Sequence, residues 1–339
     1  MKNYKPHFES QQRPYPKDGS AMNTENIDVL VIGRSCLDTI AVINQFPAEN
    51  QKVPLEFRLT EGGGQGGTAS CCISRLGGTV AYVGKLGDDD EGRFCLQRLE
   101  KFGVATDFIE VVSGGKTPVA YVFVSAASGH RTIIYERNLL PRITINEQLI
   151  RLADRAQVVL LDPEVTYLGG PLKAATGGRI KIVYDCERWR PGLEDVMDTA
   201  DYFIPSAEFL DSDRLNLGAI PFTQKVIKLN KLVTGQLVVT RGGKGAYYPA
   251  GDKLYQVAAP AVKAVDTIGA GDNFHAAFAL ALKKGFELHQ AVKLSVAVAS
   301  LSCREFGGRE GIPVMEVAMR VADKLKERVL DTGYSMLDS

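Results

Sequence analysis

Short apolar runs alternate with longer segments of helical spacing along most of the chain. Runs of mostly apolar residues predict buried strands, at 29–32, 80–83, 158–161, 180–184, 202–204 and 237–240. Apolar residues recurring every three or four positions predict helices, at 93–102, 146–153, 223–232, 273–284 and 288–304. Strands separated by helices are typical of a mostly parallel sheet with helices on both faces. The pattern therefore predicts an α/β fold.

Two segments interrupt this rhythm. Residues 40–60 and 117–136 alternate polar and apolar positions, for example at Tyr121, Phe123 and Tyr135. Alternation with a period of two is typical of strands that expose one face to solvent. Taken alone, the two segments are expected to form hairpins at the edge of the sheet.

The most informative motif lies at residues 266–278, which read DTIGAGDNFHAAF. The small residues Gly269, Ala270 and Gly271 lead into Asp272 and then into an amphipathic helical pattern. A helix N-terminus without bulky side chains exposes unpaired N–H groups and a partial positive charge, so it suits an anion. A carboxylate beside it could accept a proton from a hydroxyl that attacks a phosphoryl group. From the residues alone, Asp272 could equally be an N-cap after a glycine-rich turn.

Composition narrows the classes of function. With 339 residues and 45% hydrophobic content, the chain can bury a substantial core. Lys and Arg together number 40, as do Asp and Glu, so charge gives no reason to expect nucleic acid or a membrane surface as partner. We expect residues 1–26, which are polar and lack the apolar stretch of a secretory signal, to be a disordered extension. Residues 331–339 are expected to form a C-terminal tail.

The cysteines indicate a reducing compartment. They include no C-x-x-C pair, and the chain is large, so buried free thiols in a cytoplasmic protein are expected in place of a disulfide framework. The six positions are Cys36, Cys71, Cys72, Cys95, Cys186 and Cys303. The four histidines show no spacing typical of a zinc site.

A second glycine-rich segment, residues 62–67, satisfies G-x-G-x-x-G and has acidic residues at 88–90, about twenty positions on. A dinucleotide site needs this fingerprint on the turn after the first strand, where this chain instead has the turn 33–38, GRSCLD. An oxidoreductase is therefore disfavoured. The sequence also lacks the P-loop pattern G-x-x-x-x-G-K-[ST]. Because glycine lets the backbone approach a ligand closely, residues 62–67 suit a sugar held by main-chain amides.

Together these motifs resemble those of the ribokinase-like (PfkB) sugar kinases, whose signature is D-T-x-G-A-G-D-x-F. Residues 80–89 (VAYVGKLGDD) and 240–245 (TRGGKG) resemble further motifs of the family. Residues 307–313 (GGREGIP) are similar to the tail of its sulfofructose-kinase-like and fructose-directed members. The resemblance implies a ribokinase-like three-layer α/β fold over residues 27–330, with a mostly parallel central sheet. It also implies a small β-sheet lid, built from about 40–60 and 117–136.

The resemblance implies roles for individual residues. Asp272 would be the catalytic base, and the neighbouring small residues would form an anion hole, namely Gly269, Ala270 and Gly271. The sugar would be contacted by Asp38, Gly63, Gly64 and Thr68, where Thr68 replaces the asparagine usual in the family. Asp38 taken alone could equally be a turn or cap residue. The ATP site would be lined by Thr240, Gly242, Gly245 and Cys303.

Magnesium is expected because phosphoryl transfer requires its charge to be neutralised. Many family members carry N-x-x-E, whereas residues 205–209 read PSAEF, so Ser206 replaces the asparagine and Glu208 comes one residue early. We therefore expect Mg²⁺ to be held by phosphates and water, with Glu208 as a ligand through water. Asp266 is a candidate contact for a monovalent cation such as K⁺.

Arginines near the lid bear on the substrate. Arg34, Arg131 and Arg137 are either solvated surface charge or contacts for an anionic group, because an arginine fork suits a carboxylate, phosphate or sulfonate. With Thr68 and the 307–313 tail, they favour a ketose-like substrate with an anionic group over ribose or a nucleoside. Arg137 is the expected contact of that group.

Two further expectations concern partners and the alternative function. Related kinases often pair their lids, so a homodimer through the lid is predicted. A non-catalytic sugar-sensing protein of the same fold is the alternative to a kinase, since fold alone does not fix function. An aspartate at 272 after an intact Gly-Ala-Gly disfavours it.

Overall fold

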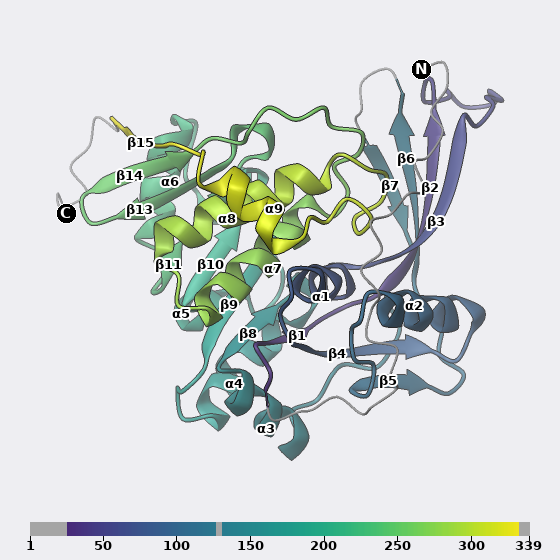
Figure 1. Cartoon of the computed structure of the whole chain (residues 1–339), viewed down its shortest axis with the longest axis horizontal. Coiled ribbons are helices and arrows are strands. Elements are labelled where there is room, and N and C mark those ends of the chain that lie inside the picture. Colours follow the sequence, from purple (N-terminus) through teal and green to yellow (C-terminus); the bar gives the residue numbers. More distant parts are fainter. Residues whose placement is uncertain (1–25, 127–130, 332–339) are drawn as a thin grey trace.

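The computed structural model describes residues 26–126 and 131–331. Its centre is a parallel sheet of seven strands, in the order β11-β10-β9-β8-β1-β4-β5 (Figure 1). In chain order the strands are β1 (Val29–Ile32), β4 (Val80–Gly87), β5 (Ile109–Val112), β8 (Val158–Leu161), β9 (Lys181–Cys186), β10 (Tyr202–Pro205) and β11 (Gln236–Leu237). The predicted α/β fold with a mostly parallel sheet is confirmed.

Helices cover both faces of this sheet. Alternate residues of a strand point to opposite faces, so Val29 and Val31 share one core and Leu30 and Ile32 the other. The first core contains residues of α1 (Gln65–Arg75), α2 (Asp90–Lys101), α7 (Ala270–Lys283), α8 (Leu288–Ser302) and α9 (Met315–Ala322). The second contains residues of α3 (Glu147–Ala156), α4 (Gly169–Ala175), α5 (Leu193–Thr199) and α6 (Phe222–Asn230). Within the described residues, no helix is both long and apolar enough to cross a bilayer.

Helix α7 differs from the amphipathic helix expected at 273–284. It begins at Ala270, and its residues from Asn273 to Ala281 are all buried. The helix packs against β8 and β9 of the sheet and against α1 and α8, so no side of this stretch faces solvent. A helix that is buried on every side must be apolar all round, and its run of alanine, phenylalanine and leucine meets that requirement.

The lid is a separate sheet of four strands in the order β3-β2-β6-β7, standing to one side of the main body (Figure 1). Its strands are β2 (Cys36–Ile43), β3 (Phe57–Gly63), β6 (Val119–Ser125) and β7 (Arg131–Tyr135). Ile40, Val42 and Val122 lie in a buried cluster on its inner face, against Ile268 and Phe306 of the main body. The lid sheet expected from the two alternating segments is therefore present.

The first lid segment is longer than predicted. Cys36 pairs with Gly63 at one end of the β2–β3 ladder, so both strands extend beyond residues 40–60. The turn expected at 33–38 is therefore only three residues long, and Asp38 lies within a strand, which excludes a turn or cap role for it.

A third sheet was not predicted. It is antiparallel and contains β12 (Val239–Thr240), β13 (Ala246–Ala250), β14 (Lys253–Val257) and β15 (Glu327–Leu330). The strand predicted at 237–240 is divided between two sheets: Leu237 belongs to β11 of the central sheet, whereas Val239 begins β12. Leu237, Val238 and Val239 are all buried and apolar, so the sequence pattern gives no sign that the chain changes sheet between them.

Candidate active site

Parallel strands bring their carboxyl ends to one edge of the sheet, where ligands commonly bind in this class of fold. Gly33 follows β1, Asp162 follows β8, Asp185 is the last residue but one of β9, and Ser206 follows β10. The first lid strand, β2, brings Asp38 to the same edge. Most of the residues predicted for a site therefore lie around this edge.

The N-terminus of α7 is also here. Its N-cap is Gly269, with a positive φ of 70°, and Asp272 lies inside the first turn, so Asp272 is not the N-cap. A Cβ at Gly269 would lie 2.7 Å from the Cα of Gly308, and nothing lies within 4 Å of a Cβ placed at Gly271. One side of the turn is thus closely packed, and the other has open space beside Gly271, at the end of the helix where the first N–H groups have no partner within the helix.

Asp272 is half-buried, and its surroundings raise its pKa to about 7. Burial is the largest cause, because it disfavours the charged form, and the nearby carboxylate of Asp185 adds to it. His275 opposes the shift. A carboxylate with a pKa close to neutral is suited to accepting a proton during a reaction.

His275 connects Asp272 to the sheet, although the sequence alone indicates no role for it. Its Nδ1 lies 2.6 Å from the carbonyl oxygen of Gly271, and its Nε2 lies 2.9 Å from that of Ile204. Asp185 Oδ1 is 3.5 Å from the same Nε2. Burial lowers the pKa of His275, while the two carbonyls and Asp272 raise it. The ring therefore connects the first turn of α7, which contains Asp272, to the end of β10.

The sugar residues predicted from the sequence lie close together. Gly63 has no room for a side chain, because a Cβ there would collide with the Asp38 carboxylate. Asp38 Oδ1 accepts a hydrogen bond from the Cys36 thiol at 3.2 Å. Burial raises the pKa of Asp38 to about 6, opposed by the Cys36 bond and the positive charges of Arg309 and Arg34.

Arg309 was missed by sequence reasoning. Its side chain is almost fully buried, and its Nη2 donates to the carbonyl oxygen of Gly63 at 2.8 Å. Its Nε lies 3.5 Å from Thr68 Oγ1, and its Nη1 has no hydrogen-bond partner in the described chain. A side chain at Gly62 or Gly67 would collide with this guanidinium. The glycines of the 62–67 segment therefore make room for Arg309, and the arginine inside the GGREGIP tail was the available signal.

The same tail has a second connection to this segment. Glu61 is buried, accepts from the N–H of Gly62 at 2.8 Å, and forms an ion pair with Arg98 of α2. Arg98 in turn pairs with Glu310 at 2.6 Å. Residues 309 and 310 thus brace the glycine segment from two sides.

On the opposite side of the α7 N-terminus lie the residues predicted for the nucleotide. Thr240 ends β12 and forms a bridge with Ser206. Gly242 and Glu208 line one cavity of about 460 Å³, together with Phe222, Lys225 and Arg241. From the sequence, Glu208 is expected to bind Mg²⁺ through water and Gly242 to contact ATP, so the two predicted residues share one cavity. Gly245 closes the turn between β12 and β13, where a Cβ would collide with the Val257 carbonyl.

Cys303 and Asp266 lie next to each other at the start of the motif. The carbonyl of Cys303 accepts from the N–H groups of Val265 and Asp266. The Asp266 carboxylate accepts from Ile268 N at 2.9 Å and from Gly307 N at 3.0 Å, so it braces the turn that leads to α7. Among the described residues, no group of three His, Cys, Asp or Glu side chains could hold a metal ion.

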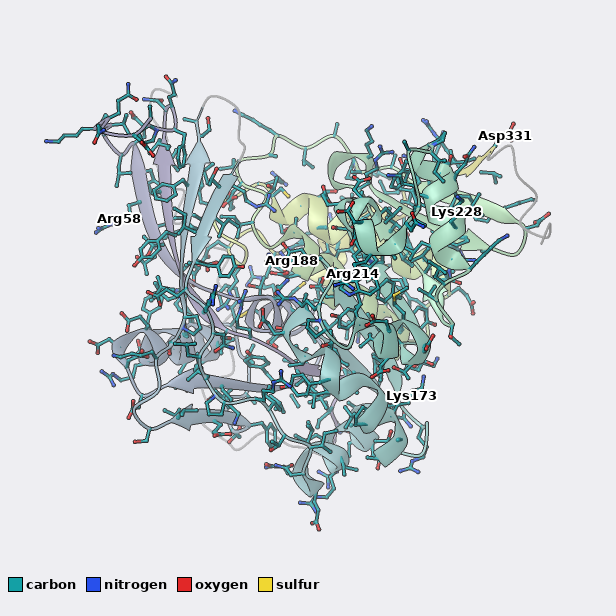
Figure 2. The ribbon with its side chains drawn as sticks, turned by 180° about the vertical axis from the view of Figure 1, so that it is seen from behind. Arg58, Lys173, Arg188, Arg214, Lys228 and Asp331 are labelled. Atoms are coloured by element: carbon teal, nitrogen blue, oxygen red, sulfur yellow. The ribbon has the colours of Figure 1, made fainter. Side chains whose placement is uncertain are left out.

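The arginines of the lid have different environments. Arg131 of β7 donates to the Thr267 hydroxyl, so the lid is hydrogen-bonded to the motif. Arg137 is exposed after β7 and does not line a cavity described here, whereas its neighbour Asn138 lines a cavity of about 450 Å³ together with Arg34. Arg188, between the lid and the main body (Figure 2), lies 5.8 Å from the Tyr135 ring.

The fold and these motifs agree with known proteins. The chain matches the model of the pfkB family of carbohydrate kinases over residues 26–315 and belongs to this family, so it is a carbohydrate kinase. It is 29% identical over 293 residues to a ribokinase of Bacillus subtilis, covering 84% of this chain and 96% of that protein. It is 30% identical over 257 residues to a probable fructokinase-5 of Arabidopsis thaliana, covering 70% and 78%.

A solved structure of Arabidopsis thaliana ribokinase, complexed with ribose and ATP, superposes with a TM-score of 0.74. It is 25% identical to this chain, and the match covers 88% of this chain and 99% of that one. The family and the ribokinase-like fold predicted from the sequence are confirmed.

If Asp272 accepts the proton, Asp272→Asn should lower kcat by about 10²–10⁴-fold and leave the affinity for ATP unchanged. The wild-type kcat/KM should fall as the pH drops below about 7, because the base is then protonated. A raised pKa means that the folded state disfavours the ionised form, so the variant should be at least as heat-stable as wild type at pH 8. Asp195→Asn, an exposed acid in the first turn of α5, is the control. A destabilised variant with full kcat would show that Asp272 has only a structural role.

Arg309→Met should raise the KM for the sugar at least about tenfold, equivalent to about 1.4 kcal/mol, with the KM for ATP within about twofold. The guanidinium binds the Gly63 carbonyl and also lowers the pKa of Asp38. Without it, Asp38 should be protonated at a higher pH, so the increase in sugar KM on acidification should begin at a higher pH. Arg309→Lys retains the charge and should restore part of the affinity. A loss of thermal stability with unchanged KM values in both variants would contradict this positioning role.

Proposed function

We propose that this carbohydrate kinase transfers the γ-phosphoryl group of Mg-ATP to a primary hydroxyl of a ketose or related sugar. The observation that carries the proposal is the position of Asp272. It lies in the first turn of a helix whose N-terminus is open, close enough for the Asp38 charge to influence its pKa. A base, an anion hole and a candidate sugar carboxylate are thus grouped at one sheet edge.

In the proposed reaction, Asp38 accepts hydrogen bonds from sugar hydroxyls, and the backbone at Gly63 and Gly64 lies against the sugar. Asp272 orients the attacking hydroxyl and takes its proton late in the transfer. The amides of Gly269–Gly271 and the dipole of α7 stabilise the charge that develops on the phosphoryl oxygens. His275 holds the main chain of the first turn of α7 through the Gly271 carbonyl, next to Asp272.

ATP as the donor is supported by the related ribokinase structure with ribose and ATP. Thr240, Gly242 and Gly245 would contact the nucleotide, and the end of α8 at Cys303 would adjoin it. Mg²⁺ would neutralise the phosphates, held mainly by them and by water, with Glu208 as a ligand through water. The shared cavity of Glu208 and Gly242 fits that arrangement. Asp266 is the candidate contact for K⁺, with both carboxylate oxygens already accepting main-chain N–H groups.

A cytoplasmic location is supported by the cysteines. All six are buried and have free thiols, as is typical of proteins in a reducing compartment.

A turnover assay with MgATP and a panel of sugars tests the function. Ketohexoses, with and without an anionic group, should be phosphorylated with a higher kcat/KM than ribose or adenosine. If ribose or adenosine is the best acceptor, the ketose assignment is wrong and the alternative within the family, a ribose or nucleoside kinase, holds. If sugars bind but none is phosphorylated, while the protein remains folded, the sugar-sensing alternative holds.

The lid supports the proposal of a homodimer. Tyr121 and Ile134 are paired on neighbouring strands and lie on the face opposite the buried cluster, with 43% and 56% of their surface exposed. Apolar side chains grouped on one open sheet face commonly mark an interaction site. We expect sedimentation to show a dimer at micromolar concentration in the presence of sugar, and Tyr121→Glu combined with Ile134→Glu to give a monomer. A wild-type monomer under these conditions would rule out the lid dimer.

A further inference from the structure

A basic cavity of about 450 Å³ lies beside the sugar residues at the carboxyl edge of the sheet. Its walls are the segment 138–143 after the lid strand β7, the 3₁₀ helix Pro163–Leu168 after β8, and the loop 190–192 after β9. Arg34 and Lys85 complete it from the ends of β1 and β4. Its volume suits a small group of several atoms, at the low end of the range for ligand pockets.

The charges that face this cavity do not balance. Arg34, Lys85, Arg142 and Arg190 line it, and Glu164 is the one acidic residue in its lining. Lys85 is neutralised by Glu110 at 2.7 Å, and Arg142 lies 5.0 Å from the Tyr167 ring. Arg34 and Arg190 remain, and they share one oxygen of Glu164.

The shared carboxylate does not satisfy the two guanidinium groups. Glu164 Oε1 lies 3.5 Å from Arg34 Nη1 and 2.9 Å from Arg190 Nη2. The Nε atoms of both arginines are buried and have no hydrogen-bond partner among the described residues. Asp162 lies behind Arg34, but its oxygens accept from the main-chain N–H groups of residues 34 and 164. Two partly buried cations therefore have one carboxylate and unused donors, which is the arrangement an anion would complete.

We propose that this cavity is an anion subsite, which takes a carboxylate, phosphate or sulfonate group between Arg34 and Arg190. Arg34 joins it to the sugar residues, since the charges of both Glu164 and Asp38 act on its guanidinium to raise its pKa. A single ligand can thus present a hydroxyl to Asp272 and an anionic group to this cavity. For the part of the ligand that presents the hydroxyl, the inference rests on the proposed function. The contacts proposed for the anionic group are Arg34 and Arg190, in place of the exposed Arg137.

The anion has two chemical sources: a charged group on the sugar itself, or a free inorganic anion that acts as an effector. Kinetics with a neutral ketohexose and its phosphorylated and carboxylated derivatives distinguish them. If the sugar carries the group, the charged derivative should exceed the neutral sugar in kcat/KM by at least about tenfold, and phosphate should compete with it. If the anion is an effector, the neutral sugar should be preferred, and millimolar phosphate or sulfate should change its KM.

The variants Arg190→Gln and Arg34→Gln test the site itself. The preference for the charged sugar, or the response to phosphate, should fall by about tenfold or more in each. Arg179→Gln removes an exposed arginine paired with Asp154 and should behave as wild type. If the charged sugars have no advantage and neither anion changes the kinetics, the proposal is wrong. It is also wrong if either effect persists unchanged in both variants.

A binding measurement separates this proposal from the kinase function. Thermal shifts with phosphate and sulfate, in the presence of a non-hydrolysable ATP analogue, do not depend on turnover. A stabilisation that Arg190→Gln abolishes and Arg179→Gln retains would support the subsite even if no sugar were phosphorylated. Wild-type protein that shows no stabilisation and no kinetic effect with either anion would overturn it, whatever the outcome of the sugar panel.

Discussion

The site depends on one close contact between two stretches of backbone, at Gly269 and Gly308. Neither residue has room for a side chain. A Cβ on Gly269 would lie 2.7 Å from the Cα of Gly308, and a Cβ on Gly308 would lie 3.2 Å from the Cα of Gly269. Thr68 packs against both with its methyl group. The start of α7, the glycine segment and the 307–313 loop therefore meet at one point. Arg309 then contacts the glycine segment from that point, so the start of α7 and the segment 62–67 share a single support.

Burial and neighbouring negative charges oppose ionisation of the carboxyl groups that lie along this edge of the sheet. Burial raises the pKa values of Asp38 and Asp162 to about 6, raises that of Asp185 well above its ordinary value, and raises that of Asp272 to about 7. Folding so many carboxylates into one region costs stability at neutral pH, because their ionised forms are favoured in the unfolded chain. Arginines at 34 and 309 offset part of this cost. Such an arrangement is typical of a site that is selected for chemistry over stability.

Sequence reasoning succeeded where the information was local. The strands at 29–32 and 158–161 were predicted to the residue, because strands buried on both faces read as unbroken apolar runs. Asp272 could be proposed as the base because the small-residue turn and the carboxylate lie within four residues of the sequence. The split of 237–240 between two sheets was not predictable, since apolar residues continue without a break from Leu237 to Val239. Arg309 and His275 were missed because their contacts join positions far apart in the chain, Gly63 in one case and Ile204 in the other.

The hydrogen bond between Arg131 and Thr267 joins the lid to the residue pair that opens the catalytic motif. The turn that precedes Gly269 also contacts the lid through Ile268, which packs against the buried cluster of Ile40 and Val122. The position of the lid and the geometry of the turn before α7 are thus linked by this hydrogen bond and by the packing of Ile268.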